Sequence, residues 1–383
     1  MTQPTPSLSF LTRLPSWVAP LFFGVSLGLA LWRAPWAPPP AFVPPPPAAT
    51  PSQPAFFHAD SLPVAAPSAH AATLAQLADG RLAAAWFAGS REGAGDVAVW
   101  FATLDAKGWS EPLAIATRES TAGSTLAYVR KLGNPVLYRE GNRLHLWYVS
   151  AAVGGWAGSS INHALSEDGG LTWSPARKLV TSPFLNISTL VRTPPLPLAD
   201  GGLGLPVYHE FMAKHGEWLR LGPDGRILGK ERLVQPRPAL QPAATALDGQ
   251  RAVALLRDAG PGPGHVQVAT SADGGRTWPA GEALPLPNPN ASVALLRLAS
   301  GRLLLAGNPA SGREALLLWL SADEGKTWRQ ARVVESAPDG GAEFSYPALL
   351  LDRDGRIHLA YTWRRQGIKH AVFSEAWLEE GTP

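Results

Sequence analysis

The 383-residue chain contains no cysteine. This absence excludes a disulfide framework, zinc sites with thiolate ligands and a cysteine nucleophile. Charged residues are also scarce, at 16% of the sequence, and the 33 basic side chains barely outnumber the 30 acidic ones. So small and dispersed an excess of positive charge does not predict binding of nucleic acid. Lysine is rare among the basic residues, and an arginine-rich set suits the recognition of carboxylates because the guanidinium group is bidentate and always charged.

Turn-forming residues are abundant. Glycine and proline contribute 38 residues each, which argues against a mostly helical protein. Hydrophobic residues make up 45% of the chain, enough for a sizeable core, and the 15 tryptophans are suited to packing cores or lining sugar-binding clefts. No glycine-rich phosphate loop precedes a helix, so no cofactor is predicted.

An uncharged stretch of 19 residues runs from Leu14 to Trp32 between Arg13 and Arg33. Its length matches a bilayer core, and tryptophans lie where an interfacial belt would be. We therefore expect residues 1–34 to form a membrane anchor, with a cleaved signal peptide or a buried helix as alternatives. An anchored domain would face the periplasm or cell exterior, and the Ala-, Pro- and Arg-rich composition favours a bacterial inner membrane.

A proline-rich segment follows. Ten of the twenty residues from Pro35 to Pro54 are proline. Such a run favours the extended polyproline II conformation, which would reach about 60 Å at roughly 3.1 Å per residue. We expect residues 35–55 to be a linker that lifts a domain comprising residues 56–383 away from the membrane.

The remaining residues repeat six times. Each copy has a glycine-containing turn followed by an alternating apolar run, the pattern of a β-hairpin. The turns lie at Gly80, Gly141, Gly201, Gly249, Gly301 and Gly355, at intervals of 48 to 61 residues. A second turn follows each of the first five at a steady offset, which indicates four short strands per unit.

Six such units predict an all-β, six-bladed β-propeller with four-stranded blades. The sixth unit lacks the second turn, so a segment near Phe56–Leu62 is expected to supply its outer strand and close the ring. A seven-bladed ring with one disguised blade and a β-sandwich are the alternatives.

Three of the second turns share the pattern S-x-D-x-G-x-T-W, at 166–173, 271–278 and 321–328. These segments resemble the Asp boxes, or BNR repeats, of the sialidase superfamily, and the resemblance extends over residues 57–379. Serine and aspartate side chains can bind the amides of a turn, and the tryptophan can pack between blades. We therefore expect Asp168, Asp273 and Asp323 to be structural.

Propeller topology places the hairpin turns and Asp boxes on one face, so we expect chemistry on the other. Charged and aromatic residues are enriched in the loops of that opposite face, which indicates a site near the axis. Before the first strands of the blades lie His70, Arg130, Lys131, Asn134, Arg192, Gln241, Asn290 and Tyr346. After the second strands lie Arg91, Glu92, Asp96, Trp156, Glu210, Arg257, Trp363 and Arg364.

The resemblance to sialidases implies an arginine triad that holds a sugar carboxylate, a Tyr–Glu pair as nucleophile and base, and an aspartate as general acid. A neutral tyrosine nucleophile avoids repulsion by that carboxylate. Carried onto this sequence, the acid is Asp96 or Glu92, and the base is Glu210 with Glu343 behind it. The clamp candidates are Arg257 and Arg364, completed by Arg130 or Arg91. Substrate contacts are also expected from Lys131, Asn134, Arg192, Gln241, Asn290 and Trp363.

Two positions depart from the sialidase pattern. His70 stands where the first arginine of the triad is expected. Phe344 stands where the nucleophilic tyrosine is expected, and Tyr346 lies two residues later, on the same face of a strand. Because imidazole titrates near neutrality, His70 is a candidate general acid or base.

Three functions remain open. The first is a sialidase-type glycoside hydrolase (exo-α-sialidase) acting on terminal sialic acid or a related acidic sugar. The second is a non-catalytic, glycan-binding propeller. The third is a lyase or hydrolase of uronate polysaccharides that uses His70. The expected partners are an acidic glycan or sialoside and the membrane, without nucleic acid. No metal site is predicted, because His209 and His215 are six residues apart rather than the four of a zinc helix motif.

Overall fold

A computed structural model describes residues 15, 17–33, 41–49, 53–181, 186 and 188–380. The chain divides into two compact units, Met1–Pro39 and Pro40–Pro383. In the first unit the described residues form one helix, α1 (Val18–Arg33), of 16 residues. At about 1.5 Å per residue this helix is shorter than the hydrocarbon core of a bilayer. Among the described residues, no helix has both the length and the hydropathy needed to cross a membrane. The predicted anchor is therefore not supported.

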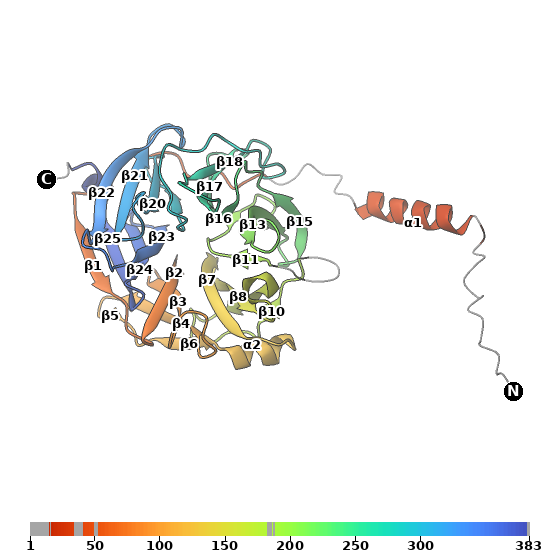
Figure 1. Cartoon of the computed structure of the whole chain (residues 1–383), viewed down its shortest axis with the longest axis horizontal. Helices are drawn as coiled ribbons and strands as arrows, with labels where there is room; N and C mark the ends of the chain where they lie inside the picture. Colours follow the sequence, from red (N-terminus) through yellow and green to blue (C-terminus); the bar gives the residue numbers. More distant parts are fainter. Residues whose placement is uncertain are drawn as a thin grey trace. The chain divides into compact units, whose positions relative to one another are not determined.

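The described residues of the second unit form six antiparallel sheets arranged as blades around an axis, as predicted (Figure 1). Blade 1 holds β2 (Ser68–Gln76), β3 (Leu82–Gly89), β4 (Ala98–Asp105), β5 (Gly108–Trp109) and β6 (Leu113–Ala116). Blade 2 holds β7 (Lys131–Glu140), β8 (Arg143–Ala151), β9 (Ser159–Ser166) and β10 (Arg177–Lys178). Blade 3 holds β11 (Leu190–Val191), β12 (Leu196–Pro197), β13 (Leu203–His209), β14 (His215–Leu221) and β15 (Ile227–Arg232).

The other three blades complete the ring. Blade 4 holds β16 (Ala239–Ala246), β17 (Ala252–Asp258) and β18 (Gln267–Ser271). Blade 5 holds β19 (Ala294–Arg297), β20 (Leu303–Gly307), β21 (Ala315–Ser321) and β22 (Arg329–Ser336). Blade 6 holds β23 (Phe344–Leu351), β24 (Ile357–Trp363), β25 (Gly367–Phe373) and β1 (Phe57–Ser61). The short helices α2 (Arg118–Thr125), η2 (Gly155–Gly158) and η3 (Ala376–Leu378) lie in connections.

The ring is closed by the amino-terminal strand of the propeller. Strand β1 pairs with β25 over five residues, from Phe57 opposite Phe373 to Ser61 opposite Lys369. Figure 1 shows β1, from the start of the propeller, beside the last strands of the chain. The predicted closure by a segment near Phe56–Leu62 is confirmed.

Blade 4 departs from the predicted four strands, because its described sheet has only three. The segment after the Asp box still runs beside β18, where the amide of Gly281 donates to the carbonyl of Val268. That segment contains Pro279, Pro285 and Pro287, which have no N–H to donate, so a regular outer strand cannot form.

Apolar clusters fill the space between neighbouring blades. One cluster joins Phe101 of blade 1 to Leu132 and Tyr148 of blade 2, and another joins Leu304 of blade 5 to Ile357 of blade 6. Because each blade buries its faces only against its neighbours, the ring has to close for the core to be complete.

The Asp boxes are structural, as predicted. In each box the serine donates to the aspartate, and the aspartate accepts from the amide and hydroxyl of the threonine four residues later. Arg251, in the hairpin turn of blade 4, is paired with Glu324 in the third box. The boxes and hairpin turns therefore share one face, called here the box face, and the opposite face is called the site face.

Part of the proline-rich segment lies against the box face. Phe42 is fully buried between Trp218 and Trp278, with ring centroids 6.0 and 6.4 Å away. The amide of Val43 donates to the carbonyl of Pro197, and the amide of Ala49 donates to that of Ala299. Residues 41–49, called here the strap, thus join blades 3, 4 and 5. The prolines at 35–40 and at 51 lie outside the described residues.

Candidate active site

The innermost strands begin with a repeated backbone irregularity. In blades 1, 2, 4 and 6 the pairing of the first two strands shifts by one residue near the site face. A non-glycine residue with positive φ lies at each shift, and blade 5 has one at the equivalent place. These residues are Ala71, Asn134, Gln241, Asn290 and Tyr346, with φ between +41° and +54°. Left-handed backbone at non-glycine residues is uncommon and is concentrated at functional sites.

The hydroxyl group of Tyr346 contacts an arginine. Nη1 of Arg257 lies 3.4 Å from the Tyr346 hydroxyl and 3.3 Å from Oε1 of Gln241, to both of which it donates. Nε of Arg257 donates to Oδ1 of Asn290 at 2.6 Å. Two amide side chains on separate blades therefore hold this guanidinium against the phenol. The sequence placed all four residues near the axis, and the structure brings them together.

A second tyrosine, which was not predicted from the sequence, lies under this group. Tyr208, in β13, is buried, and its hydroxyl accepts from Nδ2 of Asn134 at 2.9 Å and from Nε2 of Gln241 at 3.3 Å. Burial raises the pKa of Tyr208, and the nearby Glu210 carboxylate raises it further. Tyr208 alternates with strand residues that form the core, so no pattern in the sequence distinguished it.

The structure places His70, the candidate general acid or base, beneath Tyr346. Its side chain is 2% exposed and packs against Tyr346, with ring centroids 4.3 Å apart, and against Phe87. Burial lowers the pKa of His70 to about 3, so the ring is neutral at physiological pH. Neither ring nitrogen has a hydrogen-bond partner among the described residues. His70 therefore supports the Tyr346 ring by packing beneath it, a geometry that does not favour the lyase hypothesis.

Glu343 lies at the centre of a second charged group. It accepts from Nη1 of Arg313 at 3.0 Å, from Nε of Arg365 at 2.6 Å and from Oγ of Ser345 at 2.6 Å. Burial acts to raise the pKa of Glu343, but the bonds from Arg365 and Ser345 and the charge of Arg313 outweigh it and lower the pKa to about 2. Glu343 is therefore ionised and is not a proton carrier at neutral pH.

The two groups meet at Tyr346 and extend to blade 1. The guanidinium carbon of Arg313 lies 5.6 Å from the centre of the Tyr346 ring. Nη1 of Arg365 donates to Oε2 of Glu92 at 2.8 Å, which links blades 6 and 1. Arg313 was not among the residues predicted from the sequence, and Arg364 was predicted in place of Arg365. Loop conformation, which pattern alone does not reveal, decides which of two consecutive arginines turns inward.

Lys131 and Glu210 form the side of the site contributed by blades 2 and 3. Nζ of Lys131 lies 3.8 Å from the centre of the Trp156 ring. Burial lowers the pKa of Lys131, and the Glu210 carboxylate is among the charges that act on it. Burial raises the pKa of Glu210 above its ordinary value, although Arg257, Lys214 and Lys131 oppose that rise.

Several predicted residues lie outside these groups. Asp96 accepts from the amide and hydroxyl of Ser90, and these bonds lower its pKa, which does not suit a general acid. Arg364 stacks on Trp363, with its guanidinium carbon 4.9 Å from the ring centre, and not on Tyr346. Arg91 and Arg130 are exposed. Arg192 is 2% exposed beneath Tyr346, so it is not open to a substrate.

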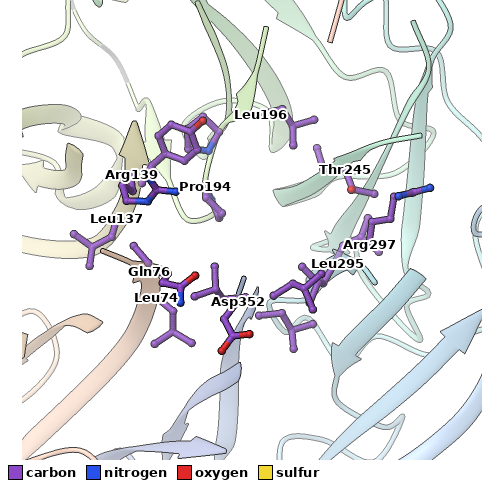
Figure 2. Close-up of a pocket in the computed structure, with 18 of the residues that line it drawn as sticks. Leu74, Gln76, Leu137, Arg139, Pro194, Leu196, Thr245, Leu295, Arg297 and Asp352 are labelled. Atoms are coloured by element: carbon purple, nitrogen blue, oxygen red, sulfur yellow. The ribbon is translucent and has the colours of Figure 1, made fainter. Parts of the chain in front are cut away.

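A cavity of about 400 Å³ opens at the axis on the box face. Figure 2 shows its wall, which includes Leu74, Leu137, Leu196 and Leu295 with Arg139 nearby. None of the predicted site residues lines it. The wall also includes the charged side chains of Arg139, Arg297, Asp352 and Arg353. Tyr346 and the groups that meet there lie on the opposite face, to which we assign the candidate site. Among the described residues, no group of three or more histidine, aspartate or glutamate side chains is placed to hold a metal ion.

Comparison with known proteins identifies the family to which this chain belongs. Residues 80–359 match the model of the BNR repeat-like domain. The chain belongs to this family. This BNR repeat-like chain is also 26% identical over 311 residues to a sialidase of Micromonospora viridifaciens, a match that covers 67% of the chain and 44% of that sialidase. The chain thus spans less than half the length of that curated relative.

Solved structures with the same fold include a sialidase and a trans-sialidase. The Hadza microbial sialidase Hz136 superposes on the BNR repeat-like chain with a TM-score of 0.65 at 15% identity, covering 80% of the chain and 65% of that protein. The leech intramolecular trans-sialidase superposes with a TM-score of 0.66 at 14% identity, covering 84% and 71% respectively. At such low identity these likenesses establish the fold alone.

Proposed function

We propose that this chain is a glycosidase of the sialidase type, which cleaves the bond between a terminal acidic sugar and its aglycone. The observation that carries the proposal is the Tyr346 hydroxyl held 3.4 Å from Arg257, with Arg313 stacked beside the same ring. Guanidinium groups bind a sugar carboxylate through charge-assisted hydrogen bonds. A phenol beside such a carboxylate is a nucleophile that carries no charge of its own before it reacts.

The proposed reaction has two steps. The Tyr346 oxygen attacks the anomeric carbon as the bond to the aglycone oxygen breaks, and a general acid protonates that oxygen. Water then displaces the tyrosine and restores the phenol. Glu210 is our candidate to take the phenol proton of Tyr346 during the attack and to return it when water displaces the tyrosine, because burial raises the pKa of Glu210 and its charge acts on Tyr208 beneath the site. Glu92, which is bound to Arg365 as Glu343 is, is our candidate for the general acid that protonates the aglycone oxygen and later takes a proton from the attacking water.

One observation favours a second candidate, a propeller that binds an acidic glycan without cleaving it. In sialidase-type catalysis a carboxylate takes the proton of the tyrosine. Among the described residues no carboxylate is hydrogen-bonded to the hydroxyl of Tyr346 or Tyr208. The side chains that share Arg257 with Tyr346 are the amides of Gln241 and Asn290. An amide orients a guanidinium group but accepts no proton.

The test uses the full chain and the fluorogenic substrate 4-methylumbelliferyl α-sialoside, from acid to neutral pH. We expect Tyr346→Phe to lower kcat by about 1,000-fold or more, since it removes the nucleophile. Arg257→Ala should weaken binding of the acidic sugar by roughly 10- to 100-fold, because a charge-assisted hydrogen bond contributes about 1.5–3 kcal/mol. The control is Tyr128→Phe, an exposed tyrosine on the site face, which should change neither quantity.

Other outcomes separate the candidates. Calorimetric binding of N-acetylneuraminic acid without turnover by the parent chain supports the binding propeller and rejects the glycosidase. A product of uronate polysaccharides that absorbs in the near ultraviolet supports the lyase. Turnover that survives in Tyr346→Phe refutes the role given to Tyr346.

A further inference from the structure

Arg192 is a buried arginine that spans the propeller axis. It follows β11 in blade 3, yet its side chain bonds to strands of blades 1 and 6. Nη1 donates to the carbonyl of Ala72 at 3.2 Å, and Nη2 donates to the carbonyls of Tyr346 at 2.8 Å and Pro347 at 3.1 Å. All three acceptors are main-chain atoms, so this side chain recognises a backbone conformation.

Among the residues that the structure describes, no acidic side chain forms an ion pair with this guanidinium. None of the ion pairs among the described residues includes Arg192, and its Nε has no described partner. Burial lowers the pKa of Arg192 to about 10, so the side chain still carries its charge at neutral pH. An uncompensated buried cation costs several kcal/mol of folding free energy. Stability therefore does not explain why an arginine lies here.

The backbone that Arg192 binds is the strained one at the site. Tyr346 has φ of +52°, lies within the bulge of β23 and precedes a proline. A non-glycine residue in the left-handed region costs on the order of 1–3 kcal/mol and persists only where its surroundings hold it. Arg192 binds the carbonyl of Tyr346, whose direction depends on this conformation, and also the carbonyl of Pro347, the next along the chain.

The same guanidinium also lies under the Tyr346 ring. Its central carbon is 5.5 Å from the ring centre, within cation–π range, and the His70 ring packs against Tyr346 as well. Arg192 thus fixes both the backbone and the ring of one residue, while its 2% exposure keeps it away from any substrate.

We infer that Arg192 is a positioning residue, which holds Tyr346 in its left-handed conformation and so presents the phenol to Arg257. The expected effect of Arg192 on turnover rests on the proposed glycosidase function. The expected effect of Arg192 on the position of Tyr346 does not depend on that function.

The test compares Arg192→Met and Arg192→Lys with a matched control. Arg332 is also a buried arginine that donates to a main-chain carbonyl, that of Trp377, and its guanidinium carbon lies 4.9 Å from the Trp377 ring centre, away from the site. We expect Arg192→Met to lower kcat at least 30-fold and to change KM less than threefold. Arg192→Lys should recover part of kcat, because an ammonium group can donate to the same carbonyls. Arg332→Met should leave both quantities unchanged.

A second measurement needs no turnover. The chain has six tyrosines, so fluorine NMR of protein labelled with 3-fluorotyrosine resolves few signals, and Tyr346→Phe assigns one of them. We expect Arg192→Met to shift and broaden the Tyr346 signal, Arg192→Lys to shift it less, and Arg332→Met to leave it in place. If Arg192→Met fails to fold, Arg192→Lys gives the same readout.

The outcomes are distinct. A Tyr346 signal that does not move in the Arg192 variants overturns the inference, as does a rise in KM alone, which would indicate direct contact with substrate. A parent chain without turnover rejects the proposed glycosidase, while a displaced Tyr346 signal in Arg192→Met still supports the positioning role.

Discussion

Phe42 offers a direct measure of how firmly the strap is attached to the propeller. Its side chain is fully buried and lies edge-on to Trp218 and Trp278. Phe42→Ala would leave a cavity between two rigid indole rings that cannot collapse into it. Substitutions of a buried phenylalanine by alanine cost about 3–5 kcal/mol, and the edge-to-face contacts place this one near 4 kcal/mol. Domains are commonly stable by only about 5–15 kcal/mol, so the expected loss is large.

The assay is equilibrium unfolding in urea, followed by tryptophan fluorescence, which also reports on Trp218 and Trp278 directly. The matched control is Val43→Ala, the next residue of the strap, whose side chain is 43% exposed and should change the unfolding free energy by less than about 0.5 kcal/mol. If the two variants unfold at the same urea concentration, Phe42 does not occupy its pocket in solution, and the reasoning about the strap is wrong.

Two further predictions concern stability. Asp273→Ala removes the acceptor for the amides of Arg276 and Thr277. It should lower the free energy of unfolding by about 1–3 kcal/mol and leave turnover unchanged. A loss of turnover in the folded variant would mean that the boxes support the site directly. Burial, together with the charge of neighbouring histidines, lowers the pKa values of His163 and His370 to about 3. The unfolded chain therefore binds more protons, so stability is complete above about pH 6.5 and falls by roughly 1.4 kcal/mol per pH unit for each histidine as the pH drops toward 3. The urea midpoints of unfolding at pH 7 and pH 5 test this pH dependence of stability. The difference between the two midpoints should be smaller in His370→Gln. Identical midpoints for the parent chain at the two pH values would contradict the prediction.

The repeat pattern in the sequence predicted most of the fold. Hairpin turns and Asp boxes are local signals, because turn residues and a two-residue alternation are required wherever these elements form. The absence of a second turn after Gly355 was enough to predict that β1 completes blade 6. The missing outer strand of blade 4 was not foreseen, although the prolines after Trp278 carried the signal.

The site was predicted less completely than the fold. Topology identified the face, and Tyr346, Arg257, Gln241 and Asn290 do meet there. Sequence reasoning placed His70 and Arg192 among groups that contact substrate, whereas both lie beneath Tyr346, because a shift of the strand register at the bulges decides which side chains are covered. Phe42 was assigned to a free linker, since a proline-rich segment gives no sign that one aromatic side chain fits a pocket distant in sequence.

The pairing of β1 with β25 has a consequence for how this protein is made. The amide of Phe56 is bonded to Ser374, 318 positions later in the chain, so the first strand of the propeller has no partner until β25 has left the ribosome. Blades 2 to 5 are each completed by neighbouring sequence and can assemble in order during synthesis. Until blade 6 forms, the side of blade 1 that packs on it stays uncovered. During the translation of the remaining blades this apolar surface is therefore accessible to chaperones and prone to aggregation. A chain truncated before Gly367 would lack β25, and the ring would stay open.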